Sequence, residues 1–81
     1  MTRIKHPGIY LKAELVSRGI TQKKFAKTVG MYPSHFSDLI HGRRKVSMKL
    51  AIKIAKDLGG IPEYWRELQD AWDIYKINQE K

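Results

Sequence analysis

Residues 21–42 read TQKKFAKTVGMYPSHFSDLIHG, and the spacing of their apolar side chains decides the fold. Gly30 interrupts the apolar pattern and can adopt the positive φ that ends a helix. The small side chain of Ala26 lets a second helix approach the first. The stretch therefore predicts helices at about residues 21–29 and 32–41 joined by a tight turn, which is a helix-turn-helix. The apolar residues recur at the three- and four-residue spacing of buried helix faces; they are Phe25, Val29, Phe36, Leu39 and Ile40.

Capping residues place the ends of the first three helices. Pro7 suits the first position of a helix that extends to about Arg18, because its missing N–H would have no partner there. Thr21 is a good N-cap for the second helix. Pro33 opens the third helix, which Gly42 ends. The inner positions that we expect in the first helix are Leu11, Leu15 and Val16.

Two further helices follow the motif. Ser47 can cap a helix over about residues 47–58, and Gly59-Gly60 ends it. Pro62 begins a fifth helix that extends to about Gln79. No run of residues alternates between apolar and polar as a strand would. The sequence therefore predicts an all-α chain of five helices that forms one domain over residues 1–81. The inner residues of the fourth helix are Leu50, Ala51, Ile54, Ala55 and Leu58.

Length and composition limit the classes of protein that this chain can represent. Its 81 residues, of which 42% are hydrophobic, are enough for one modest core. The absence of cysteine excludes disulfides and thiolate metal sites. MTRIKHPGIY lacks the continuous apolar stretch of a secretory signal, and the helices carry too many charges to span a membrane. We expect a cytoplasmic protein that needs no cofactor.

Positive charge is concentrated in the first three quarters of the chain. Residues 1–60 hold thirteen Lys/Arg and three Asp/Glu, a balance of +10, within a formal net charge of +8 for the whole chain. Residues 61–81 have a balance of −2. A solvated basic surface would explain the charge alone. Together with the motif, however, the charge favours a nucleic acid as partner, and the motif itself indicates double-stranded DNA.

The motif also indicates which side chains would contact DNA. Base reading would fall to the outward side of the third helix, and phosphate contacts to the start of the second helix and to the basic loop. Asp38 can accept a hydrogen bond from cytosine N4; otherwise its charge requires a nearby cation such as Arg43. The base-reading candidates are Pro33, Ser34, Ser37, Asp38 and His41. The phosphate candidates are Gln22, Lys23, Arg43, Arg44 and Lys45.

The fifth helix carries both tryptophans of the chain. One reading is that its aromatic residues only close the core of the protomer. Because four short helices offer limited room for them and aromatic residues are enriched in interface cores, we expect a homodimer contact as well. Acidic residues on the polar side of this helix argue against a membrane-surface role. The interface candidates are Tyr64, Trp65, Leu68, Trp72 and Tyr75.

Catalytic and metal-binding patterns are missing from the sequence. His35 and His41 are six residues apart, which puts them on different faces of one short helix, and His6 is far from both in sequence. No HExxH motif and no cysteine cluster is present. Asp38 and His41 could hydrogen-bond, but no nucleophile accompanies them. We therefore expect neither an enzyme nor a metal protein.

Several stretches resemble the Xre/Cro family of helix-turn-helix regulators and, within it, the HigA-type antitoxins. They are HPGIYLKAEL, SRGITQ, FAKTVG, SHFSDLIHGRRKVS, AIKIAKDLGGIPEYW and LQDAWDIY, and they cover about residues 6–75. The sequence departs from the family pattern at two positions. Tyr32 stands where a Ser or Thr helix cap is common, and Asp38 stands where a basic or amide base reader is common.

The resemblance implies a lambda-repressor-like fold and a homodimer joined through the fifth helix. It also implies binding of operator DNA upstream of the protein's own operon, and neutralisation of a cognate toxin of the HigB/RelE type that cleaves messenger RNA. Two alternatives stay open: a stand-alone Cro-like repressor without a toxin partner, and a protein-interaction module that has lost DNA binding.

Overall fold

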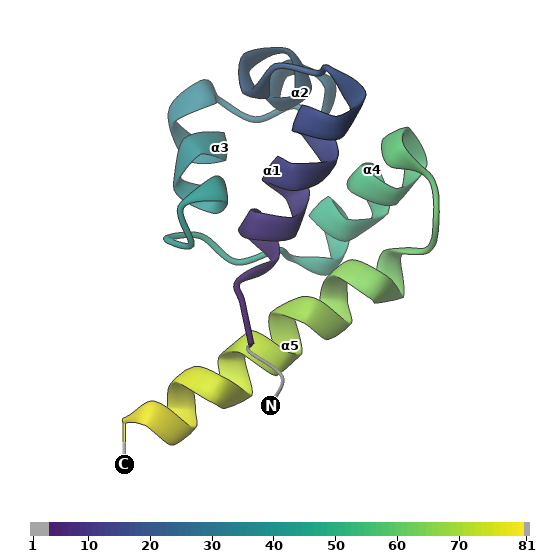
Figure 1. Ribbon diagram of the computed structural model, residues 1–81. Helices are drawn as coiled ribbons and strands as arrows, with labels where there is room; N and C mark the ends of the chain where they lie inside the picture. The colour runs from purple at the N-terminus through teal and green to yellow at the C-terminus, as the bar shows by residue number, and fades with distance from the viewer. Residues whose placement is uncertain (1–3, 81) are drawn as a thin grey trace. The chain divides into compact units, whose positions relative to one another are not determined.

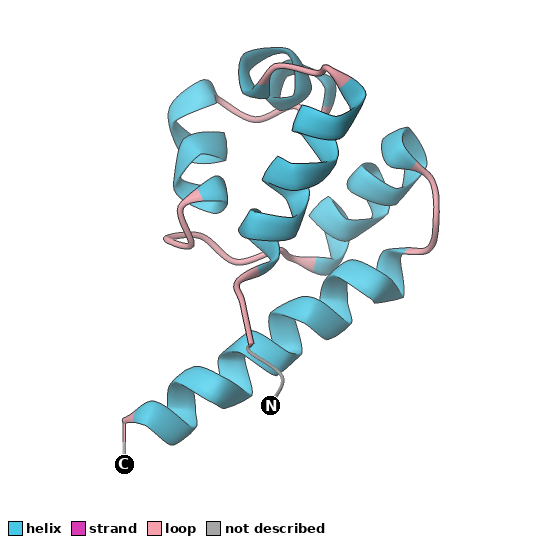
Figure 2. Cartoon of the chain, viewed as in Figure 1, coloured by secondary structure: helices cyan, strands magenta, loops and turns pink. Residues whose placement is uncertain are grey.

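The computed structural model describes residues 4–80, and these residues form five α-helices and no strand (Figures 1 and 2). The predicted all-α class with five helices is therefore confirmed. The described chain divides into two compact units. One consists of residues 8–45, and the other of residues 4–7 together with 46–80. The helices are α1 (Pro7–Arg18), α2 (Gln22–Thr28), α3 (Pro33–Ile40), α4 (Met48–Leu58) and α5 (Pro62–Gln79).

In the unit of residues 8–45, α2 and α3 pack on each other through their apolar faces. The rings of Phe25 and Phe36 lie 5.8 Å apart, centroid to centroid. Val16 is 71% exposed, so its prediction as an inner position is wrong. Successive residues lie about 100° apart around a helix, and Val16 therefore faces away from the side that Leu11 and Leu15 share. The buried apolar residues of this unit are Leu11, Leu15, Phe25, Ala26, Val29, Phe36, Leu39 and Ile40.

Side-chain caps form where the sequence predicts them. The Thr21 hydroxyl accepts a hydrogen bond from the Lys24 backbone N–H at 3.1 Å, and Ser47 does the same for Leu50 at 3.1 Å. Tyr32 precedes α3 without a side-chain cap, and Pro33 begins that helix. The positive φ expected at Gly30 is present, at 73°.

In the other unit, α4 packs against α5, and Figure 1 shows α5 extending beyond the N-terminal end of α4. Trp65 is buried, at 4% exposure, and Gln69 is buried one turn further along α5. The last turns of α5 are mostly exposed. Within residues 4–80, no helix has the length and apolar character that crossing a membrane requires. The buried apolar residues of α4 are those predicted from the sequence: Leu50, Ala51, Ile54, Ala55 and Leu58.

Candidate nucleic-acid interface

The polar side of α3 is left open because the apolar side packs inward. Phe36, Leu39 and Ile40 are buried, whereas Pro33 and Ser34 are exposed. Ser37 and Asp38 are half-buried, and His41 is exposed directly after the helix. The structure thus brings the five predicted base-reading candidates to one helix and its C-cap, which leaves their base-reading role a prediction.

His41 folds back onto the end of α3. Its Nδ1 lies 2.8 Å from the carbonyl oxygen of Ser37, which can only accept, so Nδ1 carries the donated proton. The Ser37 hydroxyl is 3.4 Å from the same nitrogen. This arrangement fixes the ring and leaves Nε2 as its remaining polar atom. His41 pairs with Ser37 rather than with Asp38, the partner that the sequence suggested as an option.

Asp38 forms an ion pair with Arg43. The sequence analysis gave this pairing as one of two options for the carboxylate. The Arg43 Nε–H donates to Asp38 Oδ1 at 3.1 Å, with the two side chains 63% and 40% exposed, respectively. The only acidic residue of α3 is therefore compensated within the same unit. The Asp38 carboxylate is therefore not left as a lone negative charge on the polar side of α3.

The turn after α3 explains why these two side chains meet. Gly42 has φ of 80°, its N–H donates to Leu39 O at 3.2 Å, and the Arg43 N–H donates to Asp38 O at 2.8 Å. These two bonds form a Schellman motif, in which the residue after the glycine lies over the third residue from the helix end. Glycine is needed here because L-residues rarely adopt this φ.

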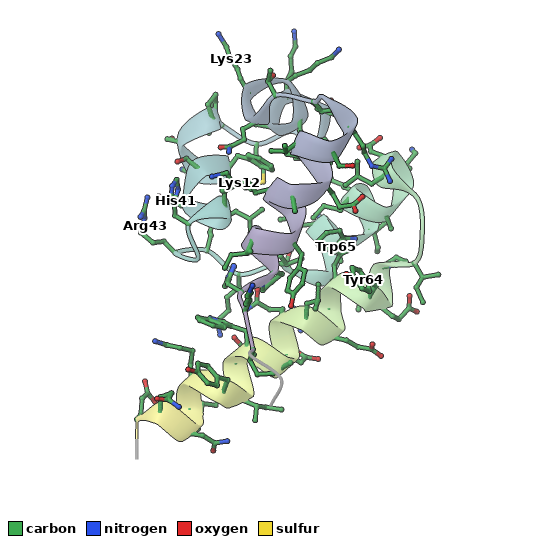
Figure 3. All side chains as sticks on the ribbon, viewed as in Figure 1. Lys12, Lys23, His41, Arg43, Tyr64 and Trp65 are labelled. Carbon is green, nitrogen blue, oxygen red and sulfur yellow. The ribbon has the colours of Figure 1, made fainter. Side chains whose placement is uncertain are left out.

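The predicted phosphate contacts also lie in this unit, in two places. Lys23 is exposed on α2 and points away from the helices in Figure 3, while Gln22 is half-buried at the start of α2. Arg43, Arg44 and Lys45 are exposed in the loop after α3. Side chains of this kind can neutralise phosphates and set affinity and register.

Residues 4–80 contain no group of three or more His, Cys, Asp and Glu side chains that could hold a metal ion. His35 packs edge-on against Tyr32, with ring centroids 5.5 Å apart. His6 is buried and packs edge-on against Trp72 at 5.7 Å.

The dimer-interface candidates on α5 differ in how much of each side chain is exposed. Tyr64 and Tyr75 are 49% and 37% exposed, whereas Trp65 is 4% exposed and its ring therefore packs inside the protomer (Figure 3 labels Tyr64 and Trp65). Leu68 and Trp72 are half-buried. We accordingly keep Trp65 out of the interface proposed below, as its surface is already covered.

Sequence reasoning missed the role of Gln69. Its side chain is 1% exposed and accepts a hydrogen bond from the Val46 N–H at 2.8 Å. A signal was present, since Gln69 lies four residues after Trp65 and three before Trp72, on the inward side of α5. A long polar side chain at such a position indicates a buried hydrogen-bond partner.

With this geometry in hand, comparison with known proteins assigns the family. A model of the helix-turn-helix family matches residues 11–65. The chain belongs to this family. Its members of the Xre/Cro type are DNA-binding regulators rather than enzymes, and HigA antitoxins are among the relatives of this chain. The predicted resemblance and the predicted non-enzymatic class are thereby confirmed.

Individual relatives agree with this assignment. Antitoxin HigA-1 of Vibrio cholerae is 37% identical over 78 residues, which cover 91% of this chain and 73% of that protein. An addiction module antidote protein of a HigA family from Coxiella burnetii is 30% identical, with a TM-score of 0.88 over 98% of this chain and 87% of that one. The curated relatives are longer, since the chain spans 66% to 79% of their lengths.

Solved structures of the same fold include proteins bound to DNA. The antitoxin HigA of Pseudomonas aeruginosa, solved with the higBA promoter, has a TM-score of 0.89 over 96% of this chain and 86% of that one. Its sequence identity of 22% means that the likeness shows a shared fold.

Proposed function

We propose that this helix-turn-helix protein is a homodimeric repressor of its own operon and the antitoxin of a toxin–antitoxin pair. In this role it binds operator DNA and neutralises a cognate toxin of the HigB/RelE type that cleaves messenger RNA. The observation that carries the proposal is the 37% identity to antitoxin HigA-1 over 91% of the chain. The Coxiella antidote, 30% identical over 98% of the chain, supports the same function.

Operator binding is supported by the unit of residues 8–45. This unit contains the polar side of α3, whose residues are exposed or half-buried, and the exposed basic loop at residues 43–45. Basic side chains next to a helix of this kind are what major-groove reading requires, because phosphate contacts fix the register in which the helix meets the bases. A HigA of the same fold has been solved with promoter DNA.

Dimerisation is supported by the apolar residues that α5 leaves exposed. Besides Tyr64 and Tyr75, α5 exposes Ile74 and Ile77, which are 61% and 58% exposed. Exposed aromatic and aliphatic groups of this size favour burial in a partner surface. A two-fold dimer would present two copies of α3 about 34–36 Å apart to a pseudo-palindromic site.

Co-expression of the chain with each neighbouring reading frame of its operon tests the toxin partnership. We expect one neighbour, a small basic protein, to arrest growth when expressed alone, to lose this effect with the chain present, and to co-purify with it. The upstream DNA of the operon should bind the chain in a mobility-shift assay. Binding of that DNA without any toxic neighbour would instead identify a stand-alone repressor. Failure of both assays would identify a protein-interaction module.

An Arg44→Ala, Lys45→Ala double variant separates the two activities. Both side chains are exposed in the basic loop, so the substitutions should leave the fold intact. We expect operator affinity to fall while co-purification with the toxin and rescue of growth persist. Loss of both activities together would contradict the assignment of this loop to DNA.

A further inference from the structure

The ion pair between Asp38 and Arg43 sets Arg43 apart from the rest of the basic loop. Asp38 Oδ1 accepts from Arg43 Nε at 3.1 Å, and the Schellman turn at Gly42 brings the two side chains together. Arg44 forms no ion pair that the structure records within residues 4–80. Adjacent arginines in one loop thus have different electrostatic surroundings.

Folding stability does not account for this pair. The side chains of Arg43 and Asp38 are 63% and 40% exposed, and ion pairs with this much access to water contribute little to stability. A hydrophobic contact often accompanies the Schellman motif between the same two positions. Here a carboxylate and a guanidinium occupy them, which indicates a role in holding the guanidinium.

The geometry of the pair determines what Arg43 can still bind. A guanidinium has five N–H donors, and the carboxylate uses the one on Nε. The two terminal nitrogens keep their donors, and Figure 3 shows Arg43 pointing outward from the end of α3. Two donors on neighbouring nitrogens match the O6 and N7 acceptors that guanine presents in the major groove.

Charge argues against a phosphate as the group bound by Arg43. The Asp38 carboxylate compensates the guanidinium and would repel an anionic phosphate brought next to it. A base edge is neutral and suffers no such repulsion. Asp38 Oδ1 accepts from Arg43, so the guanidinium already holds the carboxylate beside the end of α3.

We propose that Arg43 reads a guanine in the major groove and that Asp38 is the residue that positions it. This inference rests on the proposed binding of operator DNA through α3. Arg43 is thereby assigned to the base-reading residues, whereas its position in the basic loop alone predicts a phosphate contact. The inference also gives Asp38 a function that depends on its side chain without requiring it to touch a base.

The DNA probe would be selected by the wild-type protein from a pool of duplexes with a randomised central segment. Wild-type protein should enrich one site, in which a guanine recurs in each half. Affinity is then measured by fluorescence anisotropy at one fixed salt concentration, on the enriched site and on versions with that guanine replaced by adenine. An unselected duplex of equal length reports binding that does not depend on sequence.

Arg43→Ala and Arg44→Ala form a matched pair, because each removes one positive charge from the same loop. Arg43→Ala should reduce the preference for guanine at this position by roughly 5- to 150-fold, the range of one bidentate base contact. Arg44→Ala should weaken binding to all duplexes alike and leave the preference unchanged. Equal loss on every duplex for both variants would make Arg43 a phosphate contact and overturn the proposal.

Asp38→Asn tests the positioning role while keeping the shape of the side chain. We expect the preference for the same guanine to fall, and affinity for the unselected duplex to rise because an anion has been removed. Asp38→Glu, which can still pair with Arg43, should retain part of the preference. A change of preference at a cytosine position that Arg43→Ala leaves untouched would show that Asp38 reads a base itself, and would overturn the proposal.

Failure of the inference and failure of the proposed function give different results. If the wild-type protein enriches a site and Arg43→Ala keeps every preference in it, only the assignment of Arg43 and Asp38 is wrong. If the wild-type protein binds all duplexes alike and enriches none, recognition of an operator is wrong and the inference falls with it.

Discussion

The side chain of Gln69 on α5 is hydrogen-bonded to the backbone of Val46, two residues before α4 begins. Gln69 Oε1 accepts from the Val46 N–H at 2.8 Å, and Arg66 Nη1 donates to the Val46 carbonyl at 2.6 Å. Gln69 Nε2 in turn donates to Asp73 Oδ1 at 2.9 Å. Because Val46 is fully buried, water cannot replace these partners. Two side chains of α5 thus satisfy both backbone groups of one residue 20 and 23 positions away.

Gln69→Leu should therefore destabilise the protein although it places an apolar side chain at a buried position. The Val46 N–H would lose its acceptor, and a buried unsatisfied donor costs about 1–3 kcal/mol. For a chain of this size we expect a fall in Tm of about 4–8 °C per kcal/mol. Gln79→Leu, at an exposed position near the end of the same helix, is the control and should change Tm little. An unchanged Tm for Gln69→Leu would show that the Val46 N–H finds another acceptor.

Gly8→Ala should also destabilise the protein, although replacing glycine by alanine usually stabilises a helix. Alanine ordinarily stabilises a helix by roughly 0.5–1 kcal/mol relative to glycine. A Cβ on Gly8 would, however, overlap the carbonyl oxygen of Leu39 and lie 2.8 Å from that of Ile40. Because both atoms belong to the backbone, α1 and α3 would have to move apart. We expect a loss of about 1–3 kcal/mol, as for other overpacked sites.

Urea denaturation of Gly8→Ala beside Ser17→Ala measures this loss. Ser17 is exposed on α1, and alanine there should be neutral or slightly stabilising. A Gly8→Ala protein as stable as the Ser17→Ala protein would mean that the two helices can separate without cost.

Local signals in the sequence were enough to predict the helices. Thr21 and Ser47 cap the helices that follow them, and Pro33 and Pro62 begin α3 and α5, because capping depends on residues only a few positions apart. The prediction of Val16 as an inner position is wrong because Val16 lies about 100° from Leu15 around the helix, outside the buried side of α1.

Contacts between residues distant in sequence could not be predicted in the same way. The demand for glycine at position 8 arises only when α1 approaches the end of α3. The bond from Val46 to Gln69 likewise depends on how α4 and α5 pack. The pairing of Asp38 with Arg43 was predictable as one option, because the carboxylate of Asp38 requires a nearby cation if it does not contact cytosine. The structure supplies the turn geometry that brings the two side chains together.

DNA binding should weaken steeply with salt, in proportion to the number of phosphates contacted. Each neutralised phosphate contributes about −0.9 to the slope of log K against log salt. Arg44→Ala should reduce the magnitude of that slope by about 1, because it removes one exposed guanidinium from the basic loop. Anisotropy titrations of one duplex at several salt concentrations measure both slopes. A flat salt dependence of the wild-type protein would exclude the basic surface as the source of affinity.

Tyr75→Ala should weaken the proposed homodimer while leaving the protomer folded. Tyr75 is 37% exposed in the C-terminal half of α5, and its ring lies 5.5 Å from that of Trp72. A central aromatic contact in an interface is typically worth about 2 kcal/mol or more, which corresponds to a rise of roughly 30-fold in the dimer dissociation constant. Sedimentation equilibrium over a range of protein concentrations measures this constant. Ile52→Ala, which truncates a side chain 51% exposed on α4, is the control for loss of apolar surface outside α5. If Tyr75→Ala and Ile52→Ala dissociate no more readily than the wild-type protein, the dimer must form through another surface, and the exposed aromatic residues of α5 become candidates for the toxin contact instead.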